Sequence, residues 1–295
     1  MINWTNPLLK TRARARLKGR WKKYLLIGLL YLALTNIAAL ITSVALPDYI
    51  PYTEWAMGQY LMKYPDLLQE IAEMYNLQGL TMNTSLIDLH MTSRDILWNI
   101  VDVLCSVVFS VFFVQVLAVG QCRWYMEMRE GTSRVGTLFS VYTNGTQWLN
   151  TVWVRFCVAV RTVLWSLLFF LPGLVYGYKM FFVPYLLAEN PYMSKKRAIQ
   201  LSKVLTKGEK LRIFLLQLSF IGWFLLEGLV SAFCSALSAS LGGPGLLPMV
   251  IEIGGSLMIL CYMNATMAEL YACMREKAFR MGYSDQTELA GFAAA

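Results

Sequence analysis

The chain has 295 residues, of which 57% are hydrophobic and 15% charged, and its mean hydropathy is +0.49. A soluble globular protein is about 45–50% apolar and about 25% charged, so this composition excludes a soluble two-domain protein. The formal net charge is +8. Because the cations are clustered, they fit an anionic membrane face better than a nucleic acid, and we expect no nucleic-acid partner.

The cysteines and the single histidine, His90, argue against a metal site. No two cysteines form a CxxC pair, and all six lie in apolar runs or at their ends: Cys105, Cys122, Cys157, Cys234, Cys261 and Cys273. These positions are typical of small buried side chains rather than of disulfides or zinc ligands. We therefore expect no metal and no cofactor.

A basic segment, residues 1–23, precedes the apolar run 24–46. That run is longer than the apolar region of a signal peptide, so it predicts a retained transmembrane helix with the N-terminus in the cytoplasm. Within the basic segment Leu9, Ala13 and Leu17 recur at four-residue intervals. This spacing predicts an amphipathic cytoplasmic helix that can lie on the inner leaflet.

Residues 47–95 carry seven acidic residues and two basic ones. An acidic loop after such a helix belongs outside the cell, and the pattern that opens at Pro65 and Asp66 predicts a small helical insert there. The apolar run 96–120 returns the chain to a cytoplasmic loop, residues 121–151.

The apolar region 152–188 is interrupted by Leu171-Pro172-Gly173. Basic residues on both sides place both of its ends in the cytoplasm. It is then either two short crossings with a turn at Pro172 and Gly173, which we prefer because each half approaches the length of a span, or a re-entrant hairpin shielded by protein.

The rest of the chain continues this alternation of basic and apolar segments. The expected elements are a basic cytoplasmic helix at 189–212, spans at 213–241 and 246–273, and a cytoplasmic tail at 274–295. The sequence therefore predicts an all-α, polytopic transmembrane helix bundle with both termini inside. It has about six spans, or four plus a re-entrant hairpin.

Two short similarities suggest an internal repeat. Residues 16–19 resemble 205–208, and 125–130 resemble 271–276. Parallel repeats of this kind occur in transporters, although similar chemistry at membrane boundaries can also produce such matches.

One set of residues carries a family resemblance: Trp165 to Gly173, Leu187-Ala188-Glu189-Asn190-Pro191, Ala198-Ile199, Ser202, Lys207-Gly208, Phe214 and Ser219-Phe220-Ile221-Gly222-Trp223. The chain thereby resembles the DUF975 family of bacterial integral membrane proteins, which is uncharacterised. The resemblance implies a multipass protein of the bacterial cytoplasmic membrane and no particular activity. It makes these positions worth testing: Glu189, Asn190, Pro191, Ser202, Gly208 and Trp223.

Glu227 is the strongest single candidate, because it lies halfway along the span 213–241. A carboxylate at that depth is either protonated or paired with a cation such as Arg161, Arg155 or Lys179. A structural pair is the favoured interpretation, and a cation or proton site is the alternative.

The two basic segments offer cations for lipid headgroups or a protein partner: Arg12, Arg14, Arg16, Lys18, Arg20, Lys195, Lys196, Arg197, Lys203 and Lys207. Each cation near anionic lipid contributes about 1 kcal/mol, but their role in setting topology alone also explains both segments. In the second segment Ala198, Leu201 and Leu205 share one face. Glu189-Asn190-Pro191 is expected to end the preceding span and cap that helix.

No P-loop, dinucleotide fingerprint, GxSxG or HExxH motif is present, which disfavours the common enzyme classes. The leading hypothesis is a non-enzymatic bacterial membrane protein that binds lipid, a membrane protein partner or a second copy of itself as an accessory component. The alternative is a small-solute or proton-coupled transporter built around Glu227.

Overall fold

The structure, a computed structural model, describes residues 4–45, 93–131, 133–240 and 246–291. The chain forms two compact units, residues 1–35 with 110–295 and residues 36–109. Nearly all of the expected acidic insert, 47–95, lies outside the described residues. The described part of the second unit consists of the end of α2 and helix α5.

Every regular element in the described ranges is helical, which confirms the all-α prediction for that part of the chain. In chain order the elements are α1 (Asn6–Leu17), α2 (Trp21–Ala45), α5 (Ser93–Phe109), the π turn η2 (Ser110–Val114), α6 (Gln115–Glu130), the 3-10 helix η3 (Val135–Thr143), α7 (Gly145–Leu168), α8 (Phe170–Lys179), α9 (Val183–Glu189), α10 (Lys195–Leu205), α11 (Lys210–Ser240) and α12 (Leu246–Arg280).

Four helical stretches among the described residues are long and apolar enough to cross a membrane: Ile96–Glu130, Gly145–Leu168, Lys210–Ser238 and Val250–Arg280. Only 17–22% of their apolar windows is buried inside the protein. On α11, for example, Leu229 and Phe233 are each 70% exposed. Apolar surface of this extent needs lipid or another apolar partner to cover it, so the fold is that of a membrane protein.

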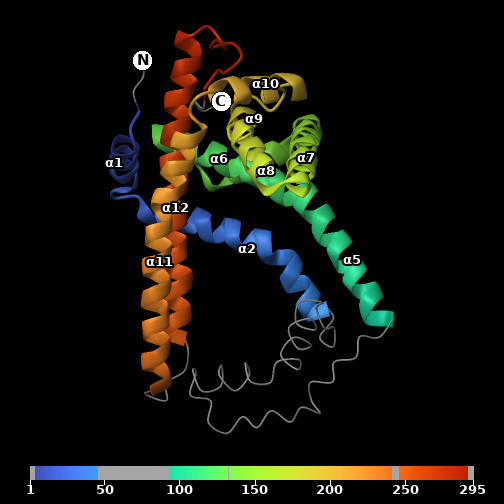
Figure 1. Ribbon diagram of the computed structural model, residues 1–295, viewed down its shortest axis with the longest axis vertical. Helices are drawn as coiled ribbons and strands as arrows, with labels where there is room; N and C mark the ends of the chain where they lie inside the picture. Colours follow the sequence, from blue (N-terminus) through green and yellow to red (C-terminus); the bar gives the residue numbers. More distant parts are fainter. Residues whose placement is uncertain (1–3, 46–92, 132, 241–245, 292–295) are drawn as a thin grey trace. The chain divides into compact units, whose positions relative to one another are not determined.

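Helices α11 and α12 run side by side, and α1 packs against α12 (Figure 1). The apolar stripe of α1, formed by Leu9, Ala13 and Leu17, is completely buried. That stripe therefore contacts protein and not lipid, and the expectation that the helix lies on the inner leaflet stays a prediction. The helix also ends at Leu17, earlier than the basic segment does, because a turn containing Gly19 separates it from α2.

The segments proposed as repeats share local geometry. Thr5 and Ser194 cap α1 and α10, and each side chain accepts a backbone N–H from three residues further on at 3.4 Å. Gly19 and Gly208 follow these helices with φ of 75° and 78°, a conformation that favours glycine. This agreement supports an internal repeat.

Helices α7 and α8 form a tight hairpin. The helical chain breaks at Phe169, where the backbone is extended, and not at Pro172 and Gly173 as expected. Pro172 lies in the first turn of α8, where proline is tolerated. Gly173 faces Ser166 so closely that a Cβ at Gly173 would lie 2.7 Å from the Ser166 Cα atom. Glycine is thus required for the close approach of the two helices.

The π turn η2 has side-chain partners for two of its carbonyl groups. Tyr142 donates a hydrogen bond to the Phe113 carbonyl at 2.6 Å, and the Trp148 indole donates to the Phe112 carbonyl at 3.1 Å. A π turn disturbs the regular helical hydrogen bonding. The two aromatic donors therefore help to hold it and attach η3 and α7 to it.

Candidate functional site

Helix α10 is held against the turn between α8 and α9 by a buried serine. The Ser202 hydroxyl donates to the Lys179 carbonyl at 2.8 Å and accepts the Phe182 N–H at 3.3 Å. The predicted apolar face of α10 is buried, with Ala198, Leu201 and Leu205 at most 2% exposed. These contacts direct the opposite, basic face of α10 outward beside α7 and α8.

The N-terminus of α10 differs from the sequence prediction. Its cap is Ser194, and Glu189-Asn190-Pro191 does not cap it. Asn190 ends α9 and donates from its side chain to the Glu288 carbonyl at 3.0 Å. The Asn190 side chain, which was expected to cap the next helix, is thus hydrogen-bonded to a residue of the C-terminal tail nearly a hundred positions away.

A cavity of about 690 Å³ lies between α7, α8 and α10. Its lining combines three cations, Arg161, Lys179 and Lys203, with the apolar side chains of Trp165, Leu171, Pro172 and Val175 and with Tyr176. None of the described residues that line it carries a carboxylate. We call it the basic cavity.

A second cavity of about 350 Å³ shares Arg161 and Lys203 with the basic cavity and continues along α10. It adds Lys195 and Lys196, and again no acidic side chain lines it. Lys195 lies 5.0 Å from the centre of the Trp153 ring. The two cavities together therefore present five cations without a compensating anion in their walls.

The three cations of the basic cavity form no ion pair with any described carboxylate. The Tyr176 hydroxyl beside them has no hydrogen-bond partner, although Tyr176 is only 8% exposed. Burying a hydroxyl without a hydrogen bond is unfavourable. The cavity therefore contains several hydrogen-bond donors, the three cations and the Tyr176 hydroxyl, that have no anionic or hydrogen-bond partner among the described residues.

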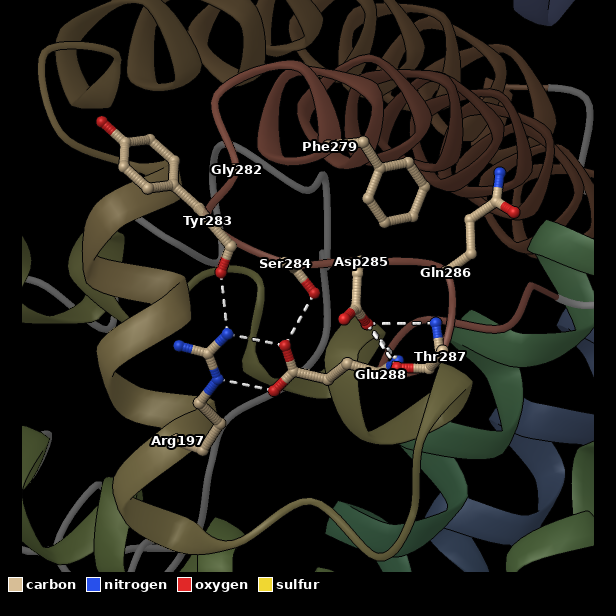
Figure 2. Close-up of a pocket in the computed structure, with 9 residues that line it drawn as sticks. All are labelled: Arg197, Phe279, Gly282, Tyr283, Ser284, Asp285, Gln286, Thr287 and Glu288. Atoms are coloured by element: carbon tan, nitrogen blue, oxygen red, sulfur yellow. Dashed lines mark hydrogen bonds and ion pairs between the residues drawn. The ribbon is translucent and has the colours of Figure 1, made fainter.

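Arg197, on another side of α10, contrasts with these cations (Figure 2). It donates to both carboxylate oxygens of Glu288, at 2.5 and 2.6 Å, and to the Tyr283 carbonyl at 2.7 Å. These hydrogen bonds raise the pKa of Arg197 and hold the pKa of Glu288 below its ordinary value. Ser284 also donates to Glu288. Arg197, Ser284 and Glu288, which line a cavity of about 740 Å³ here, already bind one another.

Two buried carboxylates, which the sequence analysis did not select as charge sites, join the ends of several helices. Glu269, with a side chain 1% exposed, lies 2.9 Å from Arg129 and 3.6 Å from Arg16. Glu189, completely buried, lies 2.6 Å from Arg275 and accepts a hydrogen bond from Tyr271 at 2.6 Å. Burial raises the pKa of the Glu189 carboxyl, and its hydrogen-bond and charge partners oppose that shift.

Glu227 has no ion pair with Arg155, Arg161 or Lys179. Its side chain lies against α12, where a Cβ at Gly255 would be 2.7 Å from the Glu227 Cγ atom. One carboxylate oxygen is buried without a hydrogen-bond partner. The structure therefore separates Glu227 from the three cations that the sequence suggested for it.

Arg155 instead contacts Gln115 at the start of α6 through a hydrogen bond from its guanidinium group. The two side chains line a cavity of about 380 Å³ between α7 and the α8–α9 region. The three cations proposed for Glu227 thus divide between two places, with Arg161 and Lys179 in the basic cavity and Arg155 beside α6.

The docking cations of α1 are mostly engaged by α12. Arg12 and Arg14 donate to Cys273 and to the Tyr262 hydroxyl, and Arg16 pairs with Glu269. Lys18 and Arg20 are exposed after the helix, as is Lys207 after α10. The first basic segment is therefore largely structural. In the second, Lys195 donates to Cys157 at 3.8 Å, whereas no described side chain accepts from Lys196 or Lys203.

The family-resemblance positions do not form one site. Glu189, Asn190, Pro191 and Ser202 lie around α9 and α10. Trp223 is 46% exposed on α11, and Gly208 shapes the turn after α10. Most of these positions thus hold α10 in place rather than line the basic cavity.

The apolar helices and basic boundary define a helical membrane protein. The profile of the DUF975 family, described as a protein of unknown function, matches residues 4–278, and the chain belongs to this family. No curated protein and no solved structure matches the chain.

Proposed function

We propose that this is a non-enzymatic multipass protein of the bacterial cytoplasmic membrane that binds anionic lipid at its cytoplasmic boundary. The supporting observation is the set of cations around α10 that lack carboxylate partners among the described residues, whereas Arg129, Arg197 and Arg275 are each paired with a glutamate. Close to an anionic leaflet each such cation is favoured by about 1 kcal/mol. In this interpretation α10 is the lipid-facing member of the two basic helices.

The proposed topology has both termini inside, with crossings by α2, by α5 and α6 together, by α11 and by α12. The α7–α8 hairpin enters the membrane without crossing it. Arg161 and Lys179 share a cavity with α10, and beyond them lie only residues 162–168 of α7 and the ten-residue α8. These segments reach about 10–15 Å, compared with a hydrocarbon thickness of about 30 Å.

The exposure of the hairpin tip supports this topology. Leu167, Leu168, Phe169 and Leu171 are 64–77% exposed. Apolar side chains exposed to this degree are suited to lipid. The backbone at the break is hydrogen-bonded, since Phe169 N–H donates to Trp165 and Gly173 N–H to Phe169. The non-helical residue thus meets the requirement that backbone groups inside a membrane have partners.

Cysteine labelling tests the topology. In a cysteine-free variant carrying Phe169→Cys, a membrane-impermeant maleimide added to intact spheroplasts should give no product. Gly243→Cys, in the turn that the sequence places outside, provides the positive control. Labelling of position 169 from outside would instead show that the region crosses twice.

Lipid analysis tests the function. The full chain purified in mild detergent should retain anionic phospholipid at a higher mole fraction than the membrane from which it was extracted. Mass spectrometry of the extracted lipids measures this enrichment. Retained lipid with the same composition as the membrane would contradict the proposal.

One observation favours the alternative, a proton-coupled or small-solute transporter. The buried Glu227 oxygen without a partner is an unpaired polar group within a membrane helix, which is the usual mark of a functional position. In liposomes containing a pH-sensitive dye, this alternative predicts proton flux that Glu227→Gln abolishes. Glu252→Gln, at an exposed position on α12, is the matched control. Absence of flux with the unmodified chain under an imposed gradient would remove proton coupling.

A further inference from the structure

We infer that the basic cavity between α7, α8 and α10 binds the phosphate-bearing headgroup of an anionic phospholipid. In this site Arg161, Lys179 and Lys203 surround the phosphate, and the apolar wall contacts the glycerol and the first part of an acyl chain. The inference rests on the proposed lipid-binding function and assigns its site.

The charge of the cavity selects an anion. Three cations from three different helices line it, and no carboxylate neutralises them. An arginine can bind a phosphate through two parallel hydrogen bonds, and lysines add mobile point charges. The adjoining cavity adds Lys195 and Lys196, which extends the positive potential along α10.

The apolar wall selects a lipid over free phosphate. Trp165, Leu171 and Val175 line the same space as the cations and are 47%, 69% and 45% exposed. A free phosphate ion gains no favourable contact from apolar side chains. A lipid does, because it carries apolar and charged groups within a few bonds of each other. Basic pockets between membrane helices on the cytoplasmic side are typical headgroup sites.

Tyr176 provides an observation independent of charge. Tyr176 is one of the residues that line the cavity, more than nine-tenths of it is buried, and its hydroxyl is buried without a hydrogen-bond partner among the described residues. A phosphate or ester oxygen in the cavity would provide the missing acceptor. The Arg197 cavity lacks this signature, because its hydroxyl, carboxylate and guanidinium groups bind one another.

Binding can be measured with the full chain in phosphatidylcholine nanodiscs that contain increasing amounts of phosphatidylglycerol with brominated acyl chains. Bromine quenches nearby indoles, and the signal of Trp165 is the difference between the unmodified chain and Trp165→Phe. We expect this signal to be quenched at a low mole fraction of phosphatidylglycerol. Brominated phosphatidylcholine should quench it only at a much higher mole fraction.

The variant Arg161→Gln/Lys203→Gln should raise the half-saturating mole fraction at least about tenfold. Lys22→Gln/Lys23→Gln removes the same charge at exposed positions at the start of α2, outside the cavity, and should change it less than about twofold. Equal shifts in both double variants would overturn the site while leaving the proposed function intact. Absence of any preference for phosphatidylglycerol in the unmodified chain would overturn both.

Two further measurements distinguish a lipid ligand from free phosphate and test the role of the Tyr176 hydroxyl. Millimolar inorganic phosphate should not reverse the quenching, and reversal would show a phosphate site instead of a lipid site. Tyr176→Phe should raise the half-saturating fraction about threefold without lowering the melting temperature, because its hydroxyl has no partner within the protein. An unchanged fraction would contradict the placement of this hydroxyl at the headgroup.

Discussion

Two sides of helix α10 carry similar charges and have different surroundings. Arg197 reaches the C-terminal tail and pairs with Glu288, whereas Lys203 faces Arg161 and Lys179 across a cavity without any acid. The Arg197–Glu288 pair links two parts of the same protein, whereas the cations of the basic cavity remain available to an external anion. Positive charge alone therefore does not identify a docking surface, since the deciding feature is whether a carboxylate from elsewhere in the chain already meets it.

Removing a buried carboxylate from the paired group should have the largest effect. Glu189→Ala leaves Arg275 and the Tyr271 hydroxyl without their partner in a buried position, and we expect the free energy of unfolding to fall by about 3–5 kcal/mol. Thermal unfolding in detergent measures the change. The control is Glu276→Ala, which breaks an exposed pair with Arg280 and should cost less than about 1 kcal/mol. Equal losses in the two variants would show that the Glu189 pair has no special role.

A smaller effect is expected within the α7–α8 hairpin, whose two helices both line the basic cavity. Gly173→Ala introduces a methyl group against Ser166 and should destabilise the α7–α8 hairpin by about 1–3 kcal/mol, with weaker phosphatidylglycerol binding as a consequence. Gly177→Ala is the matched control, because a Cβ there meets no atom within 4 Å. Unfolding and lipid binding are measured on both variants. If Gly173→Ala matches the control, the close approach does not matter for the site.

The two sides of α10 can be compared directly by neutralising one cation on each. Arg197→Gln removes the partner of Glu288 and should increase backbone hydrogen exchange in residues 283–291, at a cost of about 0.5–1 kcal/mol. Lys203→Gln removes the same charge without breaking a pair and should leave that exchange unchanged. Faster hydrogen exchange of the tail in both variants would contradict the distinction between the side of α10 at Arg197, which is paired, and the side at Lys203, which is not.

The smallest effect concerns pH. Arg197 lowers the pKa of Glu288 in the folded chain. The Arg197–Glu288 ion pair therefore stabilises the fold above the ordinary carboxyl pKa, and this contribution is lost as the pH falls through the lowered pKa of Glu288 in the folded chain. A spin label at Ala290→Cys should be immobile at neutral pH and become mobile well below pH 4.5, the ordinary value. The same label in Arg197→Gln should be mobile at both pH values. Persistent immobility at low pH would show that other contacts hold the tail.

Much of the fold was predictable from local sequence patterns. Long apolar runs predict helices that cross a membrane, and the spacing of Ala198, Leu201 and Leu205 correctly predicted the buried face of α10. These features depend on neighbours within a few helical turns. The position of the hairpin break was wrong by three or four residues, because Pro172 is compatible with the first turn of a helix and the close contact of Gly173 with Ser166 is tertiary.

The site was less predictable. Arg161 and Lys179 were selected as possible partners of a midplane carboxylate, since depth along a span is all that a sequence shows. The structure places them with Lys203 instead, and no pattern in the sequence indicated this. Glu269 was likewise not selected, because its partner Arg129 is 140 positions away in the sequence.

By itself the sequence determined the class of protein, its helical elements and its family, because apolar length, helical periodicity and motif spacing are local properties of the chain. Tertiary structure alone decided which charges are used internally. Ion pairs such as those of Arg129 with Glu269 and Arg197 with Glu288 join segments far apart in sequence, and they form only where packing brings the groups within a few ångströms. The cations around the basic cavity remain unpaired for the complementary reason, since packing brings no carboxylate of the described residues to them.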